Sequence, residues 1–224
     1  MMRIKKAVFL FILIGSGLAG YSQKKDFGIW YGVAAEHKLA DKLELDLSGV
    51  LRTFKDASKI EEFFLEAGLT YKFNDYFSAG ASYRITENIE DDDAFHIRHK
   101  WFVDAKGTLP AGDLTVTARA RFQQRYKTYF EDEEDKIPDS HVRTRLKVHY
   151  DIPNFKINPY LAAELFLPAF ADVEKTVDKY RLSIGADYSF AKKHTVELEY
   201  IFQRDYLPKL SDINLISLQY NFKF

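Results

Sequence analysis

Polar and apolar residues alternate with a period of two along most of the chain. In the segment HVRTRLKVHYDI, every second residue from Val142 to Tyr150 lies on one face, and the charged or polar residues from Arg143 to Asp151 lie on the other. The segment LTVTARARFQQRYK alternates in the same way. A helix would scatter both sets around its axis, so the pattern predicts β-strands.

Eleven segments alternate in this manner, most of them over ten or more residues. Strands of globular sheets usually have about 5–6 residues, whereas a tilted strand that crosses a bilayer needs about 9–11. The segments begin near Phe27, Leu43, Ile60, Phe77, Phe95, Leu114, Val142, Ile157, Tyr180, Thr195 and Ile213. Their length favours strands that cross a membrane.

The connections between these segments also alternate in length. Short ones (ADK, FNDY, LPAGD, PNFK, AKKH) are followed by more polar and often longer ones (KDASK, NIEDDDA, FEDEEDKIPDS, AFADVEKTVDK, PKLSD). Short periplasmic turns and longer extracellular loops are typical of outer-membrane barrels. The pattern therefore predicts an all-β fold, a closed antiparallel transmembrane β-barrel of the outer membrane.

Closure of the sheet is expected because an open edge in hydrocarbon would leave backbone groups without hydrogen bonds. Eleven strands, however, would place the first strand parallel to the last, and single-chain bacterial barrels normally have even strand numbers. Either residues 27–39 bend into two short strands around Gly32, or one of the eleven segments does not belong to the wall. We therefore expect ten to twelve strands and favour twelve.

The first residues have the pattern of a signal peptide. MMRIKK is basic, AVFLFILIGSGLAG is apolar, and Gly20-Tyr21-Ser22 places small residues before a cleavage site. The apolar run is too short for a transmembrane helix. We expect residues 1–22 to be removed and residues 23–224 to form one barrel domain, secreted through the inner membrane to the outer membrane of a Gram-negative bacterium.

Composition narrows the function only slightly. Aromatic residues make up 16% of the chain, which favours β-structure and membrane interfaces. The absence of cysteine excludes disulfides and thiolate metal sites, as well as lipid attachment through a cysteine. A net charge of -1 argues against a nucleic-acid partner.

An internal repeat places aromatic residues beside the short turns. AGLTYKFNDYFSAGASY (67–83) aligns without gaps on IGADYSFAKKHTVELEY (184–200), and the closing SLQYNFKF contains Tyr-x-Phe again. We interpret these rings as a girdle at the membrane–water interface. The alternative is a set of core aromatics in a soluble sandwich.

The last strand alternates up to a C-terminal aromatic residue and resembles the signal that the barrel-assembly machinery of bacteria recognises. The residues of this assembly signal are Tyr220, Phe222 and Phe224. Together with FGIWYG, HKLADKLEL, EAGLTYKFNDYFSAGASYR and NPYLAAELF, this ending resembles the outer-membrane barrel family known as domain of unknown function 2490, common in Bacteroidota. The resemblance implies a barrel surrounded by outer-membrane lipid and assigns no catalytic residue.

The polar faces carry segregated charges. A basic stripe on neighbouring strands comprises Arg98, Lys100, Arg119, Arg121, Arg125, Arg143, Arg145 and Lys147. An acidic wall on other strands comprises Glu44, Asp46, Glu62, Glu66, Glu197 and Glu199. Because each Arg or Lys facing lipid at the bilayer midplane costs about 2–4 kcal/mol, we expect both sets inside the lumen. Like charges on adjacent strands repel, so the stripe requires counter-charge.

Two interpretations of the stripe remain open. The acids and bases form a sealed lattice of ion pairs in a structural barrel, or the stripe lines a narrow channel for small anionic solutes. A third class, an outer-membrane hydrolase, is the least favoured. Asp139, Ser140 and His141 are consecutive and point in different directions, His96 and His99 lie on opposite faces, and the chain has no Gly-x-Ser-x-Gly motif.

No catalytic residue, metal or cofactor is predicted. The acidic runs EDDD (90–93) and EDEED (131–135) offer carboxylates to Ca²⁺ or Mg²⁺, but they lack the spacing of a calcium-binding loop. We interpret them as solvated surface charge.

Overall fold

The computed structural model describes residues 25–89, 94–130, 133, 136–170, 177–191, 193–207 and 210–224. The predicted signal peptide, the acidic run 90–93 and most of the acidic run 131–135 lie outside the described residues. Within the described part of the chain, no helix is long and apolar enough to cross a membrane.

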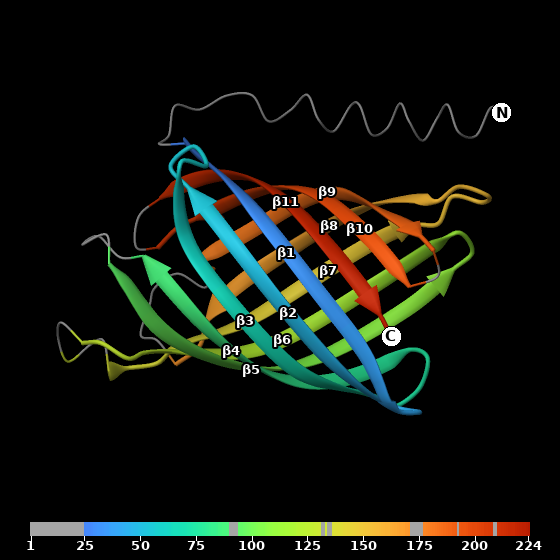
Figure 1. The fold of residues 1–224 in the computed structure, drawn as a ribbon, viewed down its shortest axis with the longest axis horizontal. Helices are drawn as coiled ribbons and strands as arrows, with labels where there is room; N and C mark the ends of the chain where they lie inside the picture. Colours follow the sequence, from blue (N-terminus) through green and yellow to red (C-terminus); the bar gives the residue numbers. More distant parts are fainter. Residues whose placement is uncertain are drawn as a thin grey trace.

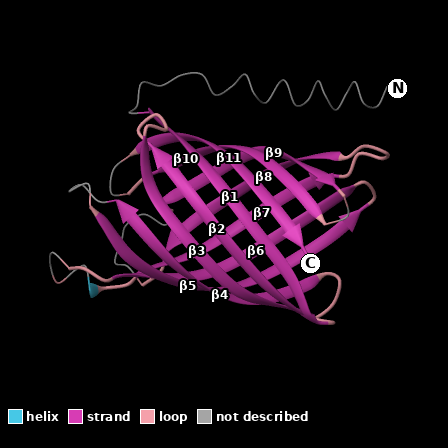
Figure 2. Ribbon diagram, viewed as in Figure 1, coloured by secondary structure: helices cyan, strands magenta, loops and turns pink. Residues whose placement is uncertain are grey.

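The described residues form eleven strands in one closed barrel (Figures 1 and 2). The strands are β1 (Lys25–Ala40), β2 (Leu43–Phe54), β3 (Lys59–Lys72), β4 (Phe77–Ile89), β5 (Phe95–Ala111), β6 (Leu114–Lys127), β7 (Asp139–Tyr150), β8 (Ile157–Pro168), β9 (Lys179–Phe190), β10 (His194–Asp205) and β11 (Ser211–Lys223). The closed barrel and the range of ten to twelve strands are confirmed, and the preference for twelve is wrong.

The barrel closes through a parallel pair, β1 with β11, whereas every other pair is antiparallel. The predicted bend at Gly32 is wrong, because β1 continues unbroken through this residue. A Cβ at Gly32 would lie only 1.9 Å from Oε1 of Gln219, its partner on β11. The glycine therefore makes room for a side chain in the seam between the two strands.

Both ends of β1 are held by further hydrogen bonds. At its start, the Asp26 carboxylate accepts hydrogen bonds from the backbone N–H groups of Lys55 (3.2 Å) and Asp56 (3.1 Å), in the connection between β2 and β3. Near its end, the carbonyl of Glu36 accepts a hydrogen bond from the backbone N–H of Phe224 at 3.0 Å. β1 is thus fixed at both ends of the barrel.

The short turns and the longer connections lie at opposite ends of the barrel (Figure 1). The turn end, at the right of the view, holds the connections at 41–42, 73–76, 112–113, 151–156 and 191–193. The loop end, at the left, holds the connection at 55–58, the opposite ends of the strands and the start of β1. The length of a connection therefore depends on the end of the barrel at which it lies, as the sequence predicts.

The outer face is apolar and exposed. Val33, Leu65 and Leu198 are 59%, 58% and 55% exposed on it, which suits a surface in contact with lipid. Among the repeated Tyr-x-Phe rings near the turn end, Tyr71, Phe73, Tyr188, Phe190 and Tyr220 are exposed and Phe222 is half-buried. They face outward from a closed barrel, so the alternative of a soluble sandwich core is wrong.

Candidate functional site

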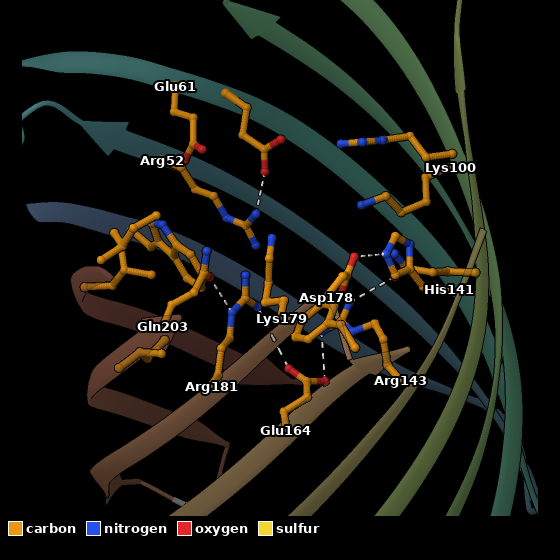
Figure 3. Close-up of a pocket in the computed structure, with 18 of the residues that line it drawn as sticks. Arg52, Glu61, Lys100, His141, Arg143, Glu164, Asp178, Lys179, Arg181 and Gln203 are labelled. Atoms are coloured by element: carbon orange, nitrogen blue, oxygen red, sulfur yellow. Dashed lines mark hydrogen bonds and ion pairs between the residues drawn. The ribbon is translucent and has the colours of Figure 1, made fainter. Parts of the chain in front are cut away.

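A cavity of about 1100 Å³ occupies the loop half of the lumen (Figure 3). We call it the loop-half cavity. All eleven strands contribute to its lining. Among the described residues that line it, eleven are Lys or Arg and eight are Asp or Glu. The cavity therefore carries an excess of three positive charges, with His141 not counted.

Seven of the eight residues of the predicted basic stripe line this cavity. The exception is Lys147, which lies nearer the turn end, where its Nζ is 3.8 Å from Glu197 and 3.5 Å from the ring centroid of Tyr160. Side chains alternate between the two faces of β5, β6 and β7. The other seven residues of the stripe therefore face the lumen, and their neighbours in the sequence face lipid.

The register between β6 and β7 places arginines opposite each other. Arg119 pairs with Arg145, and Arg121 pairs with Arg143. Arg121 is compensated within the wall by Asp104, which accepts two hydrogen bonds at 2.6 and 2.7 Å. Carboxylates of other strands therefore offset the repulsion between the facing cations.

Glu164 on β8 is the carboxylate shared by most of these cations. Its Oε1 accepts hydrogen bonds from Nη2 of Arg119 at 2.6 Å and Nη2 of Arg143 at 2.9 Å. Its Oε2 is 3.9 Å from Nη1 of Arg181, and Figure 3 shows Glu164 between Arg143 and Arg181. We call these four residues the central cluster. Three guanidinium groups share one carboxylate that is 6% exposed.

Aromatic rings on the lumen face support the guanidinium groups. The Cζ atoms of Arg143 and Arg181 lie 4.3 and 4.9 Å from the ring centroid of Phe166. Trp30 lies between Arg52, at 4.0 Å, and Arg181, at 5.0 Å. Cation–π contacts of this kind favour fixed guanidinium positions at the wall. Arg84 on Phe64 and Arg121 on Phe102 repeat the arrangement, each at 3.6 Å.

The predicted acidic wall divides into two groups. Glu199 and Glu197 reach the basic stripe across the lumen, at 3.3 Å from Arg145 and 3.8 Å from Lys147. The other four make their contacts with neighbouring strands instead. Glu62 pairs with Arg52 (2.5 Å), Glu66 with Arg84 (2.6 Å) and Glu44 with Lys72, and Asp46 accepts a hydrogen bond from Thr70 (2.7 Å).

Three cations that line the loop-half cavity are absent from the predicted basic stripe, namely Arg52, Lys179 and Arg181. The alternation along β9 contains the missing signal, because Lys179 and Arg181 alternate with Tyr180 and apolar residues. Proximity across the lumen, such as that of Arg181 to Trp30, depends on barrel closure and has no local sequence signal.

The turn half of the lumen is more densely packed. Tyr160 is 1% exposed, donates a hydrogen bond to Glu197 at 2.5 Å and lies against Gly185. A second cavity of about 430 Å³ lies along β1, β2 and β11, with single residues of β3 and β10 in its lining. Glu66, which pairs with Arg84, lines both cavities, so the two spaces adjoin at this ion pair.

The triad residue types at the start of β7 do not form a nucleophile and base. His141 contacts Asp178 through Nε2 at 2.5 Å and Asp139 through Nδ1 at 3.1 Å. Ser140 lies on the opposite face and accepts a hydrogen bond from Gln124 at 3.0 Å. Within the described ranges, no group of three or more His, Cys, Asp or Glu side chains is arranged to hold a metal ion.

The closed barrel and its charged lumen define a porin-like β-barrel of the outer-membrane type. The chain belongs to the family described as "Protein of unknown function (DUF2490)", whose model matches residues 27–214. This confirms the family resemblance that the sequence predicts. No curated protein matches the chain.

Solved structures of outer-membrane barrel proteins share the fold. The NanC porin is 16% identical, with 79% of this chain and 86% of that chain covered and a TM-score of 0.51. The KdgM porin is 12% identical (78% and 89% covered, TM-score 0.44), and the β domain of the Bordetella autotransporter BrkA is 11% identical (74% and 78% covered, TM-score 0.48). The similarity to the NanC porin concerns the fold alone.

Proposed function

We propose that this protein is a narrow channel for small anionic solutes in the outer membrane of a Gram-negative bacterium, which it reaches by secretion through the inner membrane. The observation that carries the proposal is the loop-half cavity of about 1100 Å³ with its excess of three positive charges. A cavity lined by charge of one sign, with low-dielectric walls, concentrates counter-ions and favours their passage.

A path along the lumen supports conduction. The loop-half cavity adjoins the second cavity at Glu66, and the second cavity extends to Glu36 and Lys223 near the turn end. The Glu66–Arg84 pair is therefore the expected constriction. The ion pairs of the central cluster are held against the wall by aromatic rings, and this arrangement leaves the cavity volume beside them.

Single-channel recording of the refolded protein in a planar bilayer tests the proposal. We expect stable openings with anion preference in a KCl gradient, and a smaller preference in the double variant Arg119→Glu/Arg143→Glu. Lys42→Glu, the same charge reversal in the turn between β1 and β2, serves as the matched control. Each variant is first shown to be folded by its faster gel mobility in unboiled SDS.

The outcomes separate the two interpretations of the lumen. Reduced anion preference in the double variant, with the control unchanged, supports a conduit through the central cluster. Silence from a folded wild-type barrel would contradict the proposal and favour the sealed lattice of ion pairs.

A further inference from the structure

Lys100 on β5 differs from its neighbours because no carboxylate among the described residues lies within ion-pair distance of it. Across the strands it pairs in register with Arg84 on β4 and Arg125 on β6. Arg84 has Glu66 at 2.6 Å, and Arg125 has Asp139 at 2.6 Å. In the described part of the chain, Lys100 makes no hydrogen bond or ion pair, although its side chain extends into the loop-half cavity (Figure 3). A cation in this setting favours a bound anion.

The central cluster provides a second positive region in the same cavity. Glu164 leaves this cluster with two positive charges, because three guanidinium groups share it. The Nε atoms of Arg119 and Arg143 are also buried without a hydrogen-bond partner. The two positive regions come from different parts of the wall, Lys100 from β5 and the cluster from β6 to β9.

The internal partner of the cluster indicates which chemical group it accepts. The group seated there is a carboxylate, held at 2.6 and 2.9 Å by two guanidinium groups, and planar guanidinium groups match carboxylates well. An anion with a single charged group can neutralise one region only. An anion with several carboxylates on a short carbon skeleton can engage Lys100 and the cluster together.

We propose that the loop-half cavity binds a small polycarboxylate, a di- or tricarboxylate anion, between Lys100 and the central cluster. The proposal rests on the proposed function, because the ligand is a permeating anion. Glu164 acts as a tethered carboxylate that competes with the solute for Arg119, Arg143 and Arg181, so a bound solute can leave again as Glu164 recovers its contacts.

Trp30 is suited to report binding, because the guanidinium groups of Arg52 and Arg181 lie 4.0 and 5.0 Å from its ring. The chain has two tryptophans, so Trp101→Phe leaves Trp30 as the only indole. Citrate, succinate and acetate are titrated against this refolded barrel in detergent at constant ionic strength, by fluorescence and by calorimetry. We expect saturable citrate binding at least roughly tenfold tighter than acetate binding, with succinate between them.

Three variants locate the site. Lys100→Gln removes no ion pair and is expected to weaken citrate binding by roughly tenfold. Lys106→Gln, on the same strand and outside the cavity lining, is the matched control and is expected to bind as the parent does. Glu164→Gln removes the internal competitor and is expected to bind citrate more tightly than the parent.

Equal affinity for citrate and acetate, or unchanged citrate binding in Lys100→Gln, would overturn the proposal. Anion-selective conductance without saturable citrate binding in either measurement would overturn it as well, and would leave the channel intact. Saturable citrate binding that depends on Lys100, in a barrel without conductance, would support the binding site and contradict the channel.

Discussion

Replacing Gly185 by alanine is expected to destabilise the barrel, because the ring of Tyr160 lies across β9 at this position. A Cβ on Gly185 would lie 2.5 Å from both Cζ and the hydroxyl oxygen of Tyr160, and 2.8 Å from the carbonyl oxygen of Leu198. These separations are too short for carbon, so the ring must move. Movement breaks the 2.5 Å hydrogen bond from Tyr160 to the Glu197 carboxylate.

The size of the effect follows from these contacts. Inserting a methyl group into a well-packed site costs about 1–3 kcal/mol, and a hydrogen bond to a charged group contributes about 1.5–3 kcal/mol. Tyr160 is 1% exposed, so water does not replace the lost contacts easily. We expect the free energy of unfolding to fall by roughly 2.5–6 kcal/mol in total.

Urea unfolding of the refolded protein in lipid vesicles, followed by tryptophan fluorescence, measures this change. Gly68→Ala is the matched control, since Gly68 occupies the same place in the internal repeat. A Cβ there meets the Ser82 hydroxyl, which can rotate away, so a smaller loss is expected. Combining Gly185→Ala with Tyr160→Leu should cost less than the sum of the two changes. A loss below about 0.5 kcal/mol for Gly185→Ala would refute the reasoning.

Two further predictions concern the lumen and assembly. Tyr160→Ala removes the ring that packs the turn half of the lumen, so single-channel conductance should rise; unchanged conductance would show that the ring does not border the ion path. We propose that Tyr220, Phe222 and Phe224 are recognised by the barrel-assembly machinery. Deleting Phe224, whose carbonyl oxygen lies 3.2 Å from Nδ1 of His37, should lower the yield of heat-modifiable barrel in cells, and an undiminished yield would contradict that role.

Much of the wall could be predicted because strand faces are a local property. Alternation along β7 places Arg143 and Arg145 in the lumen, and the repeated Tyr-x-Phe places the exposed aromatic rings near the turns. The same alternation predicts which aromatic residues, such as Phe166, lie on the lumen face. Their role as supports for guanidinium groups depends on the register between strands, which alternation does not specify.

The interactions that define the candidate site depend on the closed barrel. Glu164 meets Arg119 across β7, and Arg181 meets Trp30 across two other strands. No spacing in the sequence encodes these distances. The preference for twelve strands was wrong for a related reason, because Gly32 is consistent both with a bend and with a tightly packed seam, and only the Gln219 side chain opposite distinguishes them.

The parallel seam also limits how the chain can be reconnected. In a barrel with an even number of strands, a short turn can join the last strand to the first, since the first strand begins on the side of the bilayer where the last strand ends. Here β1 and β11 pair over twelve residues, which at about 3.3 Å per residue is about 40 Å. A circular permutant that joins Phe224 to Lys25 would need a linker of that length threaded through the lumen. Such a linker would occupy the proposed ion path, so the permutant is expected to lose its conductance.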